Sequence, residues 1–379
     1  PRPDCRQRRL AVYSGHSSAT AQPSGVPDPV FLQLNHSFPA DGVERAVPDQ
    51  ATAERLLRDC RPDFLQLIQR RRADFLEVYP DSDPELLDRF DRALMISLAR
   101  LGMRHGSWGD DFHHYHNENH ALEILDGRLG RMMDTAGLDR LPLFEWLALS
   151  LFATCHDLRQ REQVDFSHPI GNNEAASICE TRRILALSGF DSQRDRDLYN
   201  ALDMMIAGST FDPRPTPPPG EFNTAEVVTT AGALAPQLPT FLDREFPWWR
   251  EDASAVRAVE LAQMASDLDT ANVGEAFPWL AESASRLCQE REMRSGRSLD
   301  AENSGQPCLG FLSDGQERYF FELHRFCSDI GRDTFAAAKD DNADRLRRVS
   351  QALRERFNGR GPENGQAVVE AFSAYSLAP

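Results

Sequence analysis

The chain lacks long apolar runs and paired cysteines. No apolar run reaches the length of a membrane span, and the first residues, PRPDCRQRRL, lack the apolar core of a signal peptide. No CxxC pair occurs, which argues against a structural zinc knuckle. The seven cysteines are widely spread and odd in number, which is typical of reduced thiols rather than of a disulfide framework. We therefore expect a cytoplasmic protein with no membrane partner.

Basic residues are in the minority. The 42 Lys and Arg residues face 59 Asp and Glu residues, which gives a net charge of −17. Such a surface disfavours nonspecific binding to DNA, RNA or an anionic membrane. The negative charge does not exclude a small anionic substrate, because bound divalent ions would reverse the sign of the charge locally.

Strand-like alternation is scarce, and helical periodicity predicts an all-α protein. With 379 residues, 41% of them hydrophobic, the chain can bury one large core or two smaller ones. We expect an extended N-terminal arm over 1–48, rich in Pro, Ser, Gly and Gln, then a main helical domain over 49–338 and C-terminal helices over 339–379 packed on it. The expected helices cover 51–78, 84–104, 117–137, 141–154, 339–358 and 363–377, with loops at 213–219 and 296–307.

Two local signals refine these boundaries. Asp83 followed by Pro84 is typical of an N-cap and a first helical position, so a helix should begin there. Within the N-terminal arm, the apolar stretch 29–34 is a candidate for docking on the main body.

Metal-ligand residue types recur in an orderly pattern. His116 and His120 lie four apart at the start of the 117–137 segment, where we expect them on one face of a helix. The apolar helix over 141–154 runs into His156 and Asp157, and Asp269 follows much later.

Imidazole and carboxylate mixtures suit zinc, iron, manganese or magnesium. Any one of these histidines, taken alone, is more simply explained as an ordinary hydrogen-bonded residue of the core or surface than as a metal ligand. That explanation is poor for the whole set. The set predicts a metal-dependent hydrolase.

The order H…HD…D on helices resembles the HD superfamily of metal-dependent phosphohydrolases. The string YHNENHA at 115–121 is similar to the opening of the cyclic nucleotide phosphodiesterase catalytic domain, and DLDTANVG at 267–274 resembles the segment that supplies that family's last metal ligand. Asp269 aligns with this ligand better than Asp267, because Asn272 then falls in register. The NEAAS string at 173–177 also fits bacterial-type HD phosphohydrolases. The likeness spans about residues 110–330.

The resemblance implies a phosphodiesterase-like helical bundle with two divalent ions. His120, His156, Asp157 and Asp269 would bind the first ion, and Asp157 would bridge to the second. Metal-activated water would attack a phosphoester, while His116 would act as general acid on the leaving oxygen. The substrate implied first is a 3',5'-cyclic nucleotide.

Some features depart from the family or remain ambiguous. The family continues HD as HDxxHxG, whereas this chain reads HDLRQR; an insertion could make His168 the missing ligand of the second ion, or His168 is a plain loop histidine. Gln316 and Tyr319 have the spacing of the family's purine-reading glutamine and aromatic clamp. They are equally explained as a solvated residue beside a buried aromatic one.

Three alternatives stay open beside the cyclic nucleotide phosphodiesterase. The first is a broader HD-type nucleotide phosphohydrolase, and the second is a catalytically silent sensor or interaction module. The third, a mixed-valent di-iron oxygenase, is short of a ligand, because only His168 lies between Asp157 and Asp269. A homodimer is compatible with the sequence.

Overall fold

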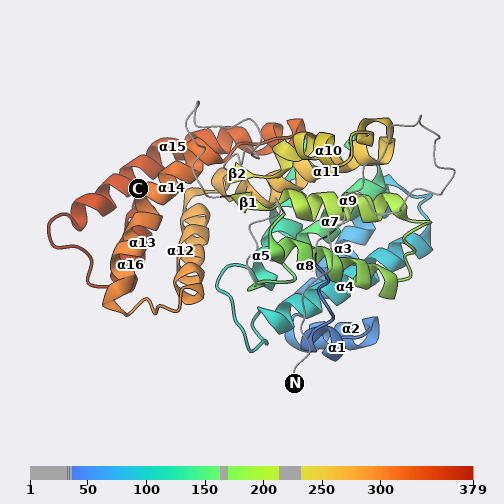
Figure 1. Ribbon diagram of the computed structural model, residues 1–379, viewed down its shortest axis with the longest axis horizontal. Helices are drawn as coiled ribbons and strands as arrows, with labels where there is room; N and C mark the ends of the chain where they lie inside the picture. The colour runs from blue at the N-terminus through green and yellow to red at the C-terminus, as the bar shows by residue number, and fades with distance from the viewer. Residues whose placement is uncertain (1–31, 33, 35, 163–169, 213–231, 379) are drawn as a thin grey trace, which may run out of the picture.

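The computed structural model of the chain describes residues 32, 34, 36–162, 170–212 and 232–378 (Figure 1). Helices dominate this part, as expected from the sequence, and one short antiparallel ribbon pairs β1 (Phe211–Asp212) with β2 (Gly232–Ala233). Most of the expected N-terminal arm and the loop at 213–219 lie outside the described residues. Leu32 is described, is buried in the main core and accepts a hydrogen bond from Arg182, in agreement with the expected docking of the 29–34 stretch.

Nine helices precede the β1–β2 ribbon in the described residues. They are α1 (Gly42–Ala46), α2 (Gln50–Cys60), α3 (Pro62–Val78), α4 (Pro84–Arg104), α5 (Glu118–Leu122), α6 (Leu129–Ala136), α7 (Leu143–Cys155), α8 (Asn172–Leu187) and α9 (Arg196–Gly208). The later ones are α10 (Leu238–Glu245), α11 (Ala253–Thr270), α12 (Phe277–Arg294), α13 (Gly305–Gly310), α14 (Gln316–Arg318), α15 (Asp329–Arg356) and α16 (Gly365–Leu377). Three π-helical segments cover Glu123–Arg128, Phe311–Gly315 and Tyr319–Leu323.

Local chemistry explains where the helices begin and end. Asp83 accepts a hydrogen bond from the Glu85 amide and Pro84 follows it, so the predicted start of α4 is confirmed. The single helix expected over 51–78 is wrong: α2 ends at Cys60, and Pro62 begins α3 because proline has no amide hydrogen to continue the preceding helix.

Two other boundaries of secondary-structure elements differ from those expected from the sequence. The loop expected up to 307 already contains a 3₁₀ turn at Glu302–Ser304 and the start of α13. The helix expected from 339 begins at Asp329, where the Ser328 hydroxyl accepts a hydrogen bond from the Gly331 amide.

Two apolar clusters form the core. The larger one gathers side chains from α2 to α11, and the smaller one gathers side chains from α12, α13, α15 and α16 (Figure 1). Helix α15 contributes to both: Phe335 packs in the larger cluster, and Leu346 and Leu353 pack in the smaller one. The expected domain boundary at 338/339 therefore falls inside one continuous helix.

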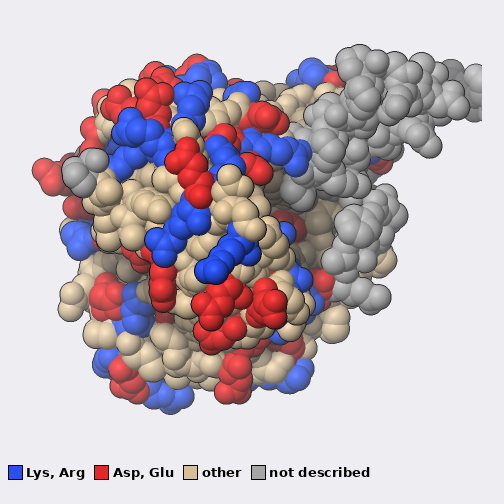
Figure 2. Space-filling view, turned by 90° about the vertical axis from the view of Figure 1, so that its left-hand side faces the viewer, with Lys and Arg blue, Asp and Glu red and all other residues tan. Residues whose placement is uncertain are grey.

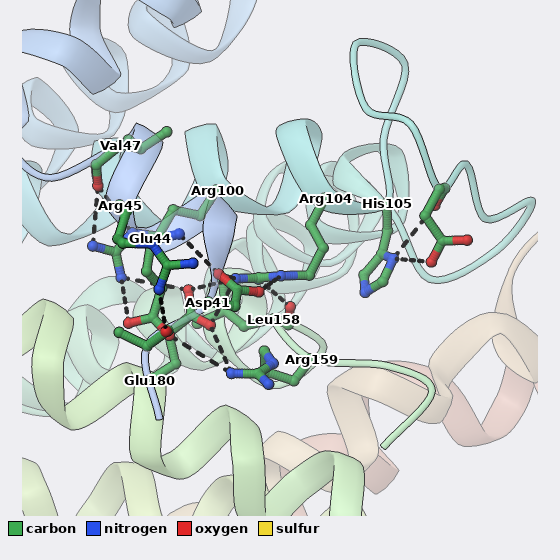
Figure 3. A network of polar contacts seen from close by, with 12 residues as sticks. Asp41, Glu44, Arg45, Val47, Arg100, Arg104, His105, Leu158, Arg159 and Glu180 are labelled. Carbon is green, nitrogen blue, oxygen red and sulfur yellow. Dashed lines mark hydrogen bonds and ion pairs between the residues drawn. The ribbon is translucent and has the colours of Figure 1, made fainter. Parts of the chain in front are cut away.

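A buried ionic network holds α1 against α4 and α8 (Figure 3). Arg100 contacts Glu44 and Glu180, and Arg104 contacts Asp41 and Glu180. Arg104 also donates to the backbone carbonyl of Leu158. Removing one partner of such a network would leave an unpaired buried charge, so Arg104 is firmly held. Its bond to the Leu158 carbonyl therefore fixes the backbone directly after the His156–Asp157 pair.

The surface in Figure 2, which lies over the side of the molecule formed by α12, α13, α15 and α16 in Figure 1, mixes acidic and basic side chains without gathering either sign into a patch. Among the described residues, none of the helices combines the length and apolar character that crossing a membrane requires.

Candidate metal centre

Helix α7 delivers two side chains to one point. Its residues are almost entirely buried and apolar, so its position in the core is strongly determined, and it ends at Cys155 directly before His156 and Asp157. The His156 Nδ1 lies 3.1 Å from the Phe152 carbonyl oxygen, one turn earlier. This contact assigns the ring proton to Nδ1 and leaves the Nε2 lone pair free to bind an ion.

His120 lies in α5, but His116 does not. The Asn117 side chain accepts a hydrogen bond from the Asn119 amide, which makes Asn117 the N-cap and Glu118 the first helical residue. The expectation that His116 and His120 share one face of a helix is therefore wrong. The two rings still lie close, with centroids 6.1 Å apart, because the chain before α5 folds back toward it.

Asp269 and Asp267 near the end of α11 have different roles. The Asp267 carboxylate accepts hydrogen bonds from the Ser328 hydroxyl and from the backbone amides of Cys327 and Ser328, so it anchors the start of α15. A Cβ at position 331 would lie 2.1 Å from Asp267 Oδ2, so Gly331 permits this close approach. Asp269 instead faces His120 and His156.

Three ligand atoms, one each from His120, His156 and Asp269, lie within 4.8 Å of one another, and Asp157 lies beside the two histidines. His156 Nε2 lies 3.0 Å from Asp157 Oδ2 and 3.4 Å from Asp269 Oδ1. His120 Nε2 lies 3.2 Å from Asp269 Oδ1 and 3.8 Å from Asp157 Oδ2. Ligands about 2.1 Å from one ion are about 3 Å apart in an octahedron and about 3.4 Å apart in a tetrahedron. We call these four residues the quartet.

The quartet is suited to hold a cation. Within the described residues, His156 Nε2 and Asp157 Oδ2 are buried and make no hydrogen bond. Burial raises the pKa of Asp157, but the neighbouring His156 and His116 outweigh it and lower that pKa to about 2. The carboxylates of Asp157 and Asp269 outweigh burial and raise the pKa of His156, so either a second proton on this ring or a bound cation would balance the charge of the two carboxylates. A divalent ion fits these residues.

A second layer of side chains orients the quartet. Asp157 Oδ1 accepts a hydrogen bond from Gln160, and Gln160 in turn accepts one from Asn173. The buried Arg128 donates to the backbone carbonyls of Leu268 and Asp269, and so holds the end of α11. Such outer contacts fix the direction in which metal ligands point.

His116 is held by a residue that the sequence analysis did not identify. Glu290 in α12 accepts hydrogen bonds from the backbone amides of Tyr115 and His116, and its Oε1 lies 2.6 Å from His116 Nδ1. Burial lowers the pKa of His116, but the carboxylates of Asp157 and Glu290 outweigh it and raise that pKa to about 9. Since Nδ1 is occupied by Glu290, Nε2 is the nitrogen available to deliver a proton.

The two expected substrate contacts lie in and beside α14. Tyr319 begins a π-helical segment, and burial and the neighbouring Asp269 carboxylate both raise its pKa, so its hydroxyl is within electrostatic reach of the quartet. Gln316 is 9% exposed. His168 lies outside the described residues.

Comparison with known proteins adds no assignment. No protein-family model matches the chain, and searches of curated proteins and of solved structures give no match either.

Proposed function

We propose that the chain is a metal-dependent phosphohydrolase that cleaves a nucleotide phosphoester, with a 3',5'-cyclic nucleotide as the first substrate to test. The observation that carries the proposal is the convergence of two imidazole nitrogens and two carboxylate oxygens beside a separate, carboxylate-bound histidine, His116.

The residues divide the chemistry between them. His120, His156, Asp157 and Asp269 would hold the first of two divalent ions. When bound, the ions polarise a phosphoryl oxygen and lower the pKa of a coordinated water. The carboxylates of Asp157 and Glu290 raise the pKa of His116, and Glu290, which is not a ligand of the quartet, faces Nδ1 and would stabilise an imidazolium that donates from Nε2 to the leaving oxygen.

Base recognition is assigned to the segment that carries Gln316 and Tyr319. Gln316 is 9% exposed and lies three residues before Tyr319 in the chain. The amide of Gln316 is suited to reading a base edge, and the Tyr319 ring supplies a flat surface for stacking. This assignment favours a nucleotide over a generic phosphoester.

The test is metal analysis of the purified chain followed by a hydrolysis screen. The apo protein, restored with Zn²⁺, Mn²⁺, Mg²⁺ or Fe²⁺ in turn, is offered cyclic nucleotides, linear nucleotides and bis(p-nitrophenyl) phosphate. We expect turnover of a nucleotide with at least one metal and none without metal. A chain that binds metal but hydrolyses none of these substrates would support a silent sensor or interaction module instead.

A further inference from the structure

A second cluster of metal-ligand side chains lies in the loop between α4 and α5. One ligand atom each from His105, Asp111 and His113 lies within 4.8 Å of the others. His105 is 2% exposed and His113 is fully buried. The His113 amide donates to the His105 carbonyl, so the loop is folded back on itself. Figure 3 shows the contacts of the His105 ring on the side away from the arginine network.

The spacing of these atoms suits one four-coordinate ion. Asp111 Oδ2 lies 3.3 Å from His105 Nδ1 and 3.1 Å from His113 Nε2. Ligands about 2.0–2.1 Å from a tetrahedral zinc ion are separated by about 3.3 Å. Two imidazoles and a carboxylate therefore fill three positions, and water can take the fourth.

The two ring nitrogens of His113 both face carboxylate oxygens. Its Nδ1 lies 3.2 Å from Glu290 Oε1, and its Nε2 faces Asp111 Oδ2. A neutral imidazole has one N–H, so one nitrogen must turn its lone pair toward a carboxylate oxygen. The lone pair of that nitrogen and the carboxylate oxygen repel each other. An ion at Nε2, or a second proton on the ring, removes this repulsion.

His105 is also suited to bind an ion. Its Nδ1 faces only oxygen acceptors, the side chain and the carbonyl of Asp111, and its Nε2 is buried without a partner. Neither tautomer pairs both nitrogens within the described residues.

Charged groups orient two of the three ligands from outside. Glu290 accepts from His113 Nδ1, which is the carboxylate–histidine arrangement that fixes a metal-binding tautomer. Arg161 lies 3.1 Å from Asp111 Oδ1, the oxygen that does not face the histidines. The same Glu290 Oε1 contacts His116 Nδ1, so this cluster is linked to the proposed general acid.

We propose that His105, Asp111 and His113 bind a divalent transition-metal ion of the zinc class, separate from the quartet, and that this ion fixes the loop leading to His116. Its role is structural, because binding closes the segment between the end of α4 and the N-cap of α5. None of the three ligands belongs to the quartet, so the proposal does not depend on the proposed hydrolysis.

The test counts metal ions in the full chain after chelation and titration with Zn²⁺ or Co²⁺. The variant Asp111→Asn should bind one equivalent fewer than the unmodified chain. The matched control Asp110→Asn removes the same charge from the adjacent, exposed residue and should bind the full number. With Co²⁺, Asp111→Asn should also lose the visible absorption of one tetrahedral site.

A double variant that lacks two quartet ligands distinguishes metal binding at this site from metal binding at the quartet. In Asp157→Ala/Asp269→Ala the quartet cannot bind, yet one equivalent should remain and should raise the thermal unfolding temperature of the chelated protein. Adding His105→Gln to that background should remove both effects, while circular dichroism without metal should stay the same. No remaining equivalent in the double variant would overturn the proposal and would leave a doubly protonated His113 as the explanation of its contacts.

Discussion

Glu290→Gln should weaken catalysis in a way that depends on pH. The substitution preserves the shape of the side chain but removes the negative charge that faces His116 Nδ1 at 2.6 Å. A hydrogen bond to a charged group contributes about 1.5–3 kcal/mol, and one pKa unit corresponds to about 1.4 kcal/mol. The pKa of His116, about 9 in the unmodified chain, should therefore fall by about one to two pH units.

The direction of the pH effect on activity depends on which protonation state of His116 acts in catalysis. The imidazolium is the acid, so activity is present below the pKa of His116 and is lost as pH rises through it. At pH 8 the protonated fraction should fall from about nine-tenths to between about one half and one tenth. At pH 6 the ring stays mostly protonated in both proteins, so the difference in kcat from protonation should nearly vanish.

The assay is kcat against pH for the nucleotide that the screen identifies, with metal content measured on the same samples. The matched control is Glu292→Gln: Glu292 is equally buried in α12, but its partner is Arg297 and not His116. The alkaline limb of kcat should move to lower pH only in Glu290→Gln. An unmoved limb, or a loss of quartet metal that accounts for the lost rate, would refute the acid role of His116.

Three further substitutions test the quartet, the acid and the base contact. Asp157→Ala should abolish both quartet metal binding and turnover, because its carboxylate would serve two ions; full metal content with full activity would disprove the centre. His116→Ala should keep the quartet metal and lose about a hundredfold or more in kcat, whereas metal loss equal to that of His120→Ala would make His116 a ligand. Gln316→Ala should cost about 1–3 kcal/mol, roughly a five- to hundredfold drop in kcat/KM for the nucleotide, and should spare bis(p-nitrophenyl) phosphate. Equal effects on both substrates would remove the base-reading role.

The helical class of the fold was predictable because each long helix carries its own periodicity and often its own cap. Asp83 and Pro84 mark the start of α4 by local chemistry alone. The break between α2 and α3 was equally marked by Pro62, yet apolar periodicity continues across it, so the pattern predicts one helix where the backbone forms two. Periodicity reports which face is buried, and it does not report a change of direction.

The quartet was predictable in composition but not in geometry. Its residues fall in three short strings, and only the resemblance to a known family indicated that these strings meet. Glu290 could not be identified in this way, because it is one of several charged residues in α12 and lies 174 positions from His116. A buried glutamate on such a helix has the same sequence pattern as an exposed one. Its role follows from four contacts that only the fold creates, with the amides of Tyr115 and His116 and the rings of His113 and His116.

The π-helical segments are another feature that residue spacing in the sequence does not predict. One follows α5 and covers Glu123–Arg128. Of the other two, one ends at Gly315, directly before Gln316, and the other begins at Tyr319. Each π turn adds a residue, which rotates every later side chain by about 100° relative to a regular helix. With a regular helix after His120, Arg128 would point away from the end of α11, and the Asp269 carbonyl would lose its donor. The π turns thus set the alignment between the segments that carry site residues, which the residue spacing in the sequence does not reveal.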